Sequence, residues 1–135
     1  KRYGIPRTPE DLEDHNVITY QYKDSAKEWE FRLPGQKPSM VSVSGSIQMN
    51  NSLALREALL NDAGITRTPT FVVGRDIQEG RLQSVLTNYE LPEISIYLVF
   101  PQRKYLSPKV RVFVEFMREY ISDTPSWDQK TKVDR

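Results

Sequence analysis

The chain has 135 residues, about the size of one ordinary domain, which is enough to bury one hydrophobic core but not two independent ones. Hydrophobic residues make up 38% and charged residues 27% of the sequence, a balance typical of globular proteins that argues against disorder of the whole chain. Nineteen Lys and Arg residues against eighteen Asp and Glu residues give a net charge of +1, spread along the chain, which provides no strong field for nucleic acid or an anionic membrane.

The first predicted element is a short helix that begins at Thr8. Thr8 can cap the helix, Pro9 suits its first position, and the acidic residues that follow favour the positive end of the helix dipole. We expect this helix to end near His15, the only histidine, whose ring can interact with the terminal carbonyls.

Three strands are predicted next. Residues 17–22 are rich in β-branched and aromatic residues. Apolar residues then alternate with polar ones at Trp29, Phe31 and Leu33 and again at Val41, Val43 and Ile47. We expect the first two strands to be joined by a hairpin-like turn, and Pro34, Gly35 and Pro38 to separate them from the third.

A longer helix is predicted from Asn51 or Ser52 to Ala63. Its apolar residues recur at helical spacing at Leu55, Ala58 and Leu59, and Leu53 and Leu60 widen the stripe. Gly64 is expected to end this helix in a left-handed conformation.

Between residues 65 and 80 the local signals conflict. Phe71-Val72-Val73 is typical of a strand, whereas Thr68-Pro69 is typical of a helix start and Gly80 of a helix stop. The pattern alone leaves both alternatives open. Residues 82–86 predict a further strand.

The last part of the chain predicts a strand and a helix. Residues 94–100 are almost continuously apolar, as expected for a strand covered on both faces. A helix begins at Ser107-Pro108, and its apolar residues fall on one face at Val110, Phe113, Val114, Met117, Tyr120 and Ile121, with Val112 and Phe116 off that face. Residues 122–135 are polar, apart from Trp127 and Val133, and predict a mobile tail.

Alternating strands and helices indicate an α/β fold, with a partly parallel sheet and flanking helices. The last strand and the last helix carry apolar side chains on more than one side. We therefore expect something outside this core to cover them.

This order of elements resembles the C-terminal part of the LysR-type transcriptional regulators, over residues 3–121. The residues that carry the resemblance are Tyr3-Gly4-Ile5-Pro6, Thr8-Pro9-Glu10-Asp11-Leu12, His15, Trp29-Glu30-Phe31, Asn50-Asn51, Gly64-Ile65, Pro69-Thr70-Phe71, Gly80-Arg81-Leu82, residues 97–101 and the run from Leu106 to Phe113. No single motif is diagnostic, but their order and spacing together are specific.

The resemblance implies a fold like that of type 2 periplasmic binding proteins. Residues 1–93 would form the second effector subdomain, and residues 94–121 would return to the first subdomain as its last strand and helix. The rest of that subdomain, the dimerising linker helix and a winged helix-turn-helix would precede Lys1. The resemblance also implies that residues 69–79 are helical. Asn61-Asp62-Ala63 departs from the small, glycine-containing turn of the family and leaves the helix end there open.

In such sensors a small molecule lies in the cleft between subdomains, where helix N-termini offer unpaired N–H groups to polar or anionic ligands. The first candidate site is the segment before the longer helix, whose polar side chains are Ser46, Gln48, Asn50 and Asn51. The alternative is that Asn51 or Ser52 only caps the helix, and both roles can coexist.

The second candidate site is Thr66-Arg67-Thr68, which follows a strand end near the cleft in the family's layout. Arg67 can bind a carboxylate with two parallel hydrogen bonds. The alternative is that Arg67 is simply exposed to solvent. Neither site is complete by itself, because the other wall of the cleft would come from the first subdomain.

No catalytic residue, metal site or cofactor is predicted. The chain has no cysteine, and the acidic residues near Glu10 lack the spacing of a calcium loop. It also has no glycine-rich phosphate loop and no nucleophile elbow. The structural reading of Trp29 and Phe31 as core residues is favoured over a platform for stacking bases.

We therefore expect the effector-binding part of a cytoplasmic regulator that binds DNA only through its winged helix-turn-helix. The intact protein would be a homodimer or homotetramer, and this fragment alone would self-associate. No apolar run approaches the roughly 20 residues that cross a bilayer. The alternatives are a solute-binding protein of a transporter and an enzyme that uses carboxylates in the cleft.

Overall fold

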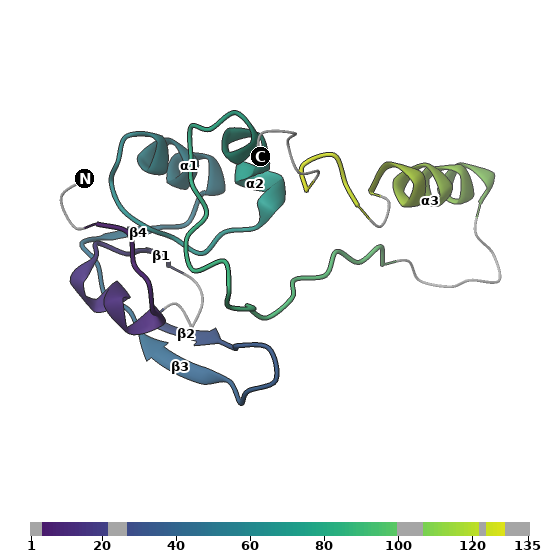
Figure 1. Ribbon diagram of the computed structural model, residues 1–135. Helices are drawn as coiled ribbons and strands as arrows, with labels where there is room; N and C mark the ends of the chain where they lie inside the picture. The colour runs from purple at the N-terminus through teal and green to yellow at the C-terminus, as the bar shows by residue number, and fades with distance from the viewer. Residues whose placement is uncertain (1–3, 22–26, 100–106, 122–123, 129–135) are drawn as a thin grey trace. The chain divides into compact units, whose positions relative to one another are not determined.

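The computed structural model describes residues 4–21, 27–99, 107–121 and 124–128 (Figure 1). The chain divides into two compact units, Lys1–Glu93 and Ile94–Arg135, called unit 1 and unit 2 below. The elements of unit 1 are the 3-10 helix η1 (Pro9–Asp14), the strands β1 (Ile18–Tyr20), β2 (Glu28–Phe31), β3 (Ser39–Ser42) and β4 (Ile47–Met49), and the helices α1 (Ser52–Leu60) and α2 (Thr70–Gln78). Unit 2 contains the helix α3 (Pro108–Ile121).

The helix expected at Thr8 is present, in the tighter 3-10 form. Asp11 accepts hydrogen bonds from the backbone N–H groups of Arg7 (2.8 Å) and Thr8 (3.0 Å), and Thr8 Oγ1 donates to its other carboxylate oxygen (3.1 Å). These backbone hydrogen bonds lower the pKa of Asp11. η1 ends where the sequence predicts, with His15 as its C-terminal cap.

The strands form two small sheets. β1 pairs with β4 in parallel, with Ile18 opposite Ile47, and on its other side Val17 makes a parallel bridge to Ile65. β2 pairs with β3 in antiparallel fashion, with Trp29 opposite Val41. The mixed parallel and antiparallel pairing with helices agrees with the expected α/β class.

Two expectations about the strands are wrong. The hairpin joins β2 to β3, whereas β1 and β2 belong to different sheets. The single strand expected at residues 41–47 is two strands, β3 and β4, because the chain crosses from one sheet to the other between them. At the crossing, Gly45 lies so close to β1 that a Cβ atom would be 1.7 Å from the carbonyl oxygen of Val17, which only glycine allows.

The core of unit 1 lies between the β2–β3 hairpin, η1 and the start of β1. Its buried side chains are Leu12, Val17, Trp29, Phe31, Val41 and Val43. The alternation of the strand sequences therefore points one face of the hairpin inward, as the period-two pattern predicts. Figure 1 shows α1 and α2 on the other side of β1 and β4 from this hairpin.

Helix α1 ends earlier than the sequence predicts. It stops at Leu60, and the residue with a left-handed backbone is Asp62 (φ 57°) rather than Gly64. Gly64 has a different role, since a Cβ atom there would lie 2.1 Å from the carbonyl oxygen of Asn16. That close approach lets the N–H group of Ile65 donate to the same oxygen at 2.9 Å.

Helix α2 resolves the conflict between residues 65 and 80 in favour of the helix. It is preceded by Pro69 and followed by Gly80, whose φ of 71° confirms the expected stop. The strand expected at residues 82–86 is wrong. The N–H groups of Arg81 and Leu82 both donate to the carbonyl oxygen of Asp76, at 2.8 and 3.2 Å, which turns the chain back against the end of α2.

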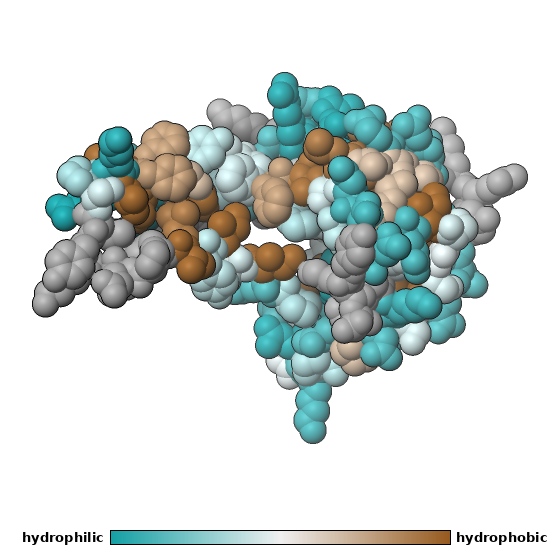
Figure 2. Space-filling model, turned by 180° about the vertical axis from the view of Figure 1, so that it is seen from behind, coloured by the Kyte–Doolittle hydropathy of each residue, from teal (hydrophilic) through white to brown (hydrophobic). Residues whose placement is uncertain are grey.

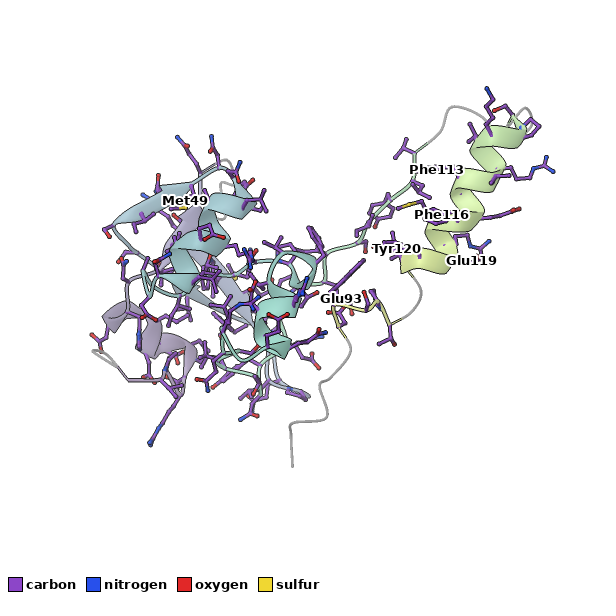
Figure 3. The ribbon with its side chains drawn as sticks, turned by 90° about the horizontal axis from the view of Figure 1, so that it is seen from above. Met49, Glu93, Phe113, Phe116, Glu119 and Tyr120 are labelled. Carbon is purple, nitrogen blue, oxygen red and sulfur yellow. The ribbon has the colours of Figure 1, made fainter. Side chains whose placement is uncertain are left out.

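Unit 2 confirms the helix at Pro108–Ile121, but residues 94–99 form no strand. A strand needs a hydrogen-bonded neighbour, and the described residues provide none for this segment. No residue of α3 is buried. Figure 3 shows Phe113, Phe116 and Tyr120 projecting from one side of the helix and Glu119 from the other.

Aromatic contacts continue beyond α3. The rings of Phe116 and Tyr120 stack with centroids 5.8 Å apart, and Tyr120 also contacts Trp127 at 6.4 Å. Residues 124–128 form a turn, while the rest of the expected tail lies outside the described residues, as does Phe100. Most of the large apolar side chains that are exposed among the described residues belong to unit 2, and Figure 2 shows brown side chains there as well as on unit 1.

Candidate functional site

Three neighbouring backbone segments of unit 1 run in parallel and end at one edge. β1 lies between β4 on one side and Ile65 on the other. Asn50 and Asn51 follow β4, and Thr66 to Thr68 follow Ile65, so both groups of side chains are placed at the same carboxyl edge. In open α/β sheets ligands bind outside this edge. The structure therefore brings five of the seven candidate residues to one side of unit 1.

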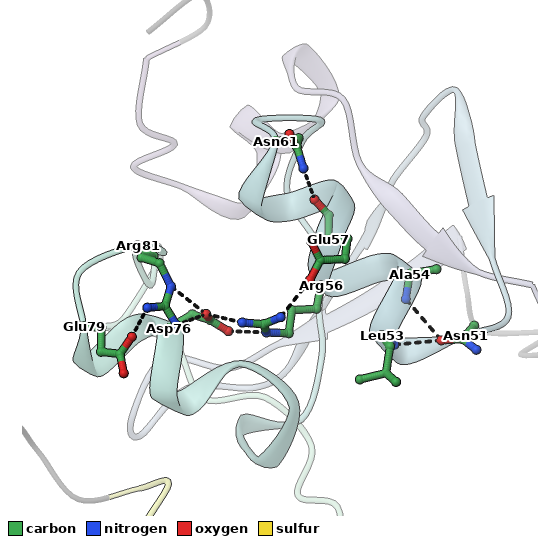
Figure 4. A network of polar contacts seen from close by, with 9 residues as sticks. All are labelled: Asn51, Leu53, Ala54, Arg56, Glu57, Asn61, Asp76, Glu79 and Arg81. Carbon is green, nitrogen blue, oxygen red and sulfur yellow. Dashed lines mark hydrogen bonds and ion pairs between the residues drawn. The ribbon is translucent and has the colours of Figure 1, made fainter.

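Asn51 caps α1. Its Oδ1 atom accepts hydrogen bonds from the backbone N–H groups of Leu53 (2.8 Å) and Ala54 (3.1 Å), as Figure 4 shows. This confirms the capping alternative and leaves the exposed amide NH₂ group at the carboxyl edge. The carbonyl oxygen of the neighbouring Asn50 accepts a hydrogen bond from Tyr20 Oη at 2.7 Å, which ties the ends of β4 and β1 together.

The structure separates Ser46 from the carboxyl edge. Ser46 precedes β4, and its backbone N–H and hydroxyl group both donate to Asn16 Oδ1, at 3.0 and 3.1 Å. Asn16 in turn donates through Nδ2 to the carbonyl oxygen of Ala63 at 2.6 Å. Ser46 thus helps to hold the amino ends of the parallel segments. Gln48 lies within β4, exposed, opposite Thr19.

Thr66 is held by the sheet, whereas Arg67 forms no ion pair with an acidic side chain of the described residues. Thr66 Oγ1 donates to the carbonyl oxygen of Ile18 at 2.7 Å. The guanidinium carbon of Arg67 lies 5.8 Å from the centre of the Trp29 ring, within the range of a cation–π contact. Desolvation lowers the pKa of Arg67, and the negative charge of Glu30 partly opposes this effect. Arg67 and Thr68 are both half-buried, so Arg67 still has part of its surface open to solvent or to a ligand.

A hollow of about 220 Å³ opens beside Arg67. Its walls come from β2, from the segment that contains Thr66 and Arg67, and from residues 84–91. Trp29, Phe31 and Tyr89 supply aromatic surface, and the rings of Phe31 and Tyr89 meet edge to face at 6.1 Å. The sequence predicted Trp29 and Phe31 only as core residues, and it gave no signal for Tyr89.

A cluster of charges around the buried carboxylate of Asp76 joins α1 to α2 and was not predicted from the sequence. Asp76 is 1% exposed and accepts hydrogen bonds from Arg56, at 2.6 and 2.7 Å, and from Arg81, at 2.9 and 2.6 Å. Glu57 and Glu79 pair with the outer sides of these arginines (Figure 4). Hydrogen bonds from Arg56, with a smaller contribution from Arg81, lower the pKa of Asp76 to about 2. An aspartate on the buried face of α2 was the one available signal.

The described residues contain no group of three His, Asp or Glu side chains suited to a metal ion. In the same part of the chain, no helix has the length and apolar character required to cross a membrane.

Comparison with known proteins gives a consistent result. Residues 2–122 match the family described as the LysR substrate binding domain. The HTH-type transcriptional regulator PtxR of Pseudomonas aeruginosa is 32% identical over 124 residues, which cover 90% of this chain and 39% of that protein. The HTH-type transcriptional activator AaeR of Escherichia coli is 27% identical over 120 residues, covering 89% of this chain and 38% of that protein. The chain thus spans about two fifths of the length of these relatives.

Solved structures share the fold. The regulatory domain of AphB from Vibrio vulnificus superimposes with a TM-score of 0.70 at 24% identity, covering 86% of this chain and 57% of that one. Full-length AphB from Vibrio cholerae, described as a virulence activator of the LTTR family, gives a TM-score of 0.72 at 22% identity, covering 86% of this chain and 39% of that one. With the family match over nearly all of its length, this chain belongs to the LysR substrate-binding domain family.

Proposed function

We propose that this chain is the effector-sensing part of a LysR-type transcriptional regulator. The family match over residues 2–122 is the observation that carries the proposal. Relatives such as PtxR and AaeR are described as HTH-type regulators, and each extends well beyond the region that this chain matches. DNA binding would belong to a winged helix-turn-helix outside these residues.

The effector is a small polar or anionic molecule that binds at the carboxyl edge of unit 1. Asn50, Asn51 and Thr66 to Thr68 supply the hydrogen-bonding groups of this wall. The N-terminus of α1 adds a partial positive charge, although Asn51 already occupies two of its N–H groups. Ser46 and Gln48 have a smaller role, because one is bonded to Asn16 and the other lies within β4.

Units 1 and 2 belong to different effector subdomains in this proposal. Residues 1–93 form the second subdomain, and residues 94–121 complete the first. A ligand in the cleft shifts the regulator between states only if it binds them with different affinities. The intact regulator acts as a homodimer or homotetramer, in which that shift changes how the DNA-binding domains are presented.

The rival functions have less support. A transporter's solute-binding protein would have relatives among transport proteins, whereas PtxR and AaeR are described as regulators. A carboxylate-dependent enzyme would need acidic side chains at the carboxyl edge, where the candidate residues are amides, hydroxyls and one arginine. We therefore propose a protein without enzymatic activity.

The effector site can be tested on the intact regulator. A thermal-shift screen of metabolites identifies a ligand, and its affinity is then measured for the wild type, Thr68→Ala and Arg67→Gln. We expect both variants to weaken binding, while Arg75→Gln, which removes an equal charge from an exposed site on α2, leaves binding unchanged. A ligand that binds the wild type, Thr68→Ala, Arg67→Gln and Arg75→Gln with equal affinity would contradict the site.

Self-association of this chain follows from the same proposal. Val112, Phe113, Phe116 and Tyr120 on α3 are all more than half exposed, which is unfavourable for apolar side chains in water. We expect light scattering to show concentration-dependent association, and Phe116→Ser with Val112→Ser to reduce it. A monomer at high concentration, with α3 still helical, would contradict this expectation.

A further inference from the structure

The hollow beside Arg67 lies entirely within unit 1 and has an aromatic lining. Its volume is about 220 Å³. A dry apolar cavity of about 150 Å³ is already large enough to hold benzene. One six-membered ring with a small substituent therefore fits, and the rings of Trp29, Phe31 and Tyr89 offer it edge and face contacts.

Arg67 places one positive charge at the wall of this hollow. Its side chain makes no hydrogen bond or ion pair with any described residue. Its guanidinium carbon lies 5.8 Å from the centre of the Trp29 ring, in a cation–π contact. Part of its hydration is lost, and this desolvation lowers its pKa because the charge of Glu30, which is not hydrogen-bonded to it, opposes the effect only in part. A bound anion would restore the missing partner, and a planar carboxylate matches the guanidinium group with two parallel hydrogen bonds.

The negative charge of Glu30 disfavours a ligand that carries more than one negative charge. Its carboxylate is close enough to act electrostatically on Arg67, and it would repel a ligand with two negative charges more strongly than one with a single charge. Ser84 and Thr87 add hydroxyl groups to the wall, which can bond to a ring substituent. These features favour a singly charged ligand with a flat apolar body.

A larger hollow on the outer side of β2 does not share these properties. Its volume is about 450 Å³, and Glu30, Glu90 and Glu93 line it together with Arg32. Arg32 is already paired with Glu90 at 2.7 Å, so no cation is left there for an anion. The two hollows differ in this respect although Leu91 lines both.

From this geometry we infer that the hollow between Trp29, Tyr89 and Arg67 binds a single-ring aromatic monocarboxylate, with the ring against the aromatic side chains and the carboxylate on Arg67. The inference deepens the proposed function, and it rests on that function only for the ligand's role as the effector. Binding itself depends on unit 1 alone.

The experiment uses Trp29 as the reporter. The chain has two tryptophans, so Trp127→Phe leaves Trp29 as the sole one. Benzoate, salicylate and phenylacetate are titrated while tryptophan emission is recorded, with benzamide as the neutral match for benzoate. We expect a saturable change with at least one carboxylate and a weaker response to benzamide.

Variants then test the role of Arg67. Arg67→Gln should weaken carboxylate binding by about tenfold to a hundredfold, the range for loss of a charge-assisted hydrogen bond. Arg67→Lys should give an intermediate loss, because it keeps the charge but not the planar pair of donors. Arg75→Gln is the control for net charge, and circular dichroism verifies that each variant is folded.

The outcomes separate this inference from the proposed function. If none of the three carboxylates changes Trp29 emission at millimolar concentration, or if Arg67→Gln binds them as the wild type does, the pocket assignment is overturned while the regulator proposal stands. If a carboxylate binds through Arg67 but does not alter DNA binding by the intact regulator, the pocket is supported and its effector role fails.

Discussion

Units 1 and 2 both contain well-formed helices, but they bury their apolar side chains to very different extents. In unit 1, Leu12 and Val17 are almost completely buried, and Leu55 of α1 is 2% exposed. In unit 2, every residue of α3 keeps contact with solvent, and Val112 is 64% exposed. A regular helix and a stable packed structure are therefore separate properties of a sequence, since most helix stability in proteins comes from packing of the apolar face.

The difference also limits where a ligand can be held firmly. A site needs side chains fixed by their neighbours, and unit 1 fixes Thr66 through Ile18, Asn50 through Tyr20 and α2 through Asp76. In the described part of unit 2, the contacts around α3 join aromatic rings: Phe116 stacks on Tyr120, and Tyr120 meets Trp127 at a tilt. The following predictions test this contrast.

The largest effect is expected for truncation of a buried leucine. Leu55→Ala should lower the free energy of unfolding of unit 1 by about 2 to 5 kcal/mol, because it removes apolar contacts and leaves a cavity. Val112→Ala, the matched change in α3, should stay within about 0.5 kcal/mol of the wild type. Urea unfolding measures both, followed through Trp29 emission in the Trp127→Phe background for unit 1 and by far-UV circular dichroism for α3. Equal losses would show that α3 is as well covered as α1.

Removing the charge of Asp76 is expected to lower the free energy of unfolding somewhat less than the largest loss expected for Leu55→Ala. Asp76→Asn leaves Arg56 and Arg81 without their shared carboxylate, and the loss should be about 3 kcal/mol, moderated because both arginines retain some contact with water. Arg75→Gln removes an exposed pair with Glu79 and should change the free energy of unfolding by less than about 0.5 kcal/mol. A small effect of Asp76→Asn would mean that packing alone joins α1 to α2.

The same carboxylate makes unit 1 sensitive to acid. The pKa of Asp76 is about 2 in the folded chain and 3.8 in the unfolded chain, so the unfolded state binds a proton more readily. Its stabilising contribution, about 2 kcal/mol, is complete above pH 4 or so and is lost as the pH falls through about 2. Urea titrations of the wild type between pH 5 and about pH 2 should therefore show a loss that Asp76→Asn lacks. Parallel curves for the two proteins would contradict this assignment.

The sequence predicts those features of units 1 and 2 that depend on neighbouring residues in the chain, and it fails for those that depend on distant ones. α3 and η1 are found where Ser107-Pro108 and Thr8-Pro9 predict them, because capping and proline preferences act within one turn. Strand pairing is not local. An alternating pattern predicts that a segment is a strand but not which strand it pairs with, so the pairing of β2, β3 and β4 was predicted wrongly. Residues 94–99 likewise have no hydrogen-bonded neighbour among the described residues and form no strand.

The candidate site was also predicted only where its features depend on neighbouring residues in the chain. Asn51 at the start of α1 was identifiable as a cap from its position, whereas the contact of Arg67 with Trp29 joins residues far apart in the chain. The family resemblance supplied the helix at residues 69–79, for which the strand-like run Phe71-Val72-Val73 gave the opposite indication. Asp76, Arg56 and Arg81 meet only after α1 and α2 have packed, so the aspartate on the buried face of α2 indicated a buried charge but not its partners.

The smallest predicted effect concerns the cap of α1 and separates its two possible roles. Asn51→Ala removes the oxygen that accepts from Leu53 and Ala54 and should cost about 1 kcal/mol, whereas Asn51→Ser keeps an acceptor and should cost a few tenths. Asn61→Ala, which removes a bond to the carbonyl oxygen of Glu57 at the other end of α1, is the control. If Asn51→Ser preserves the free energy of unfolding yet weakens effector binding, the amide group contacts the ligand in addition to capping. If Asn51→Ala costs no more than Asn61→Ala, the side chain is not an effective cap, and the order of α1 depends on burial of Leu55 instead.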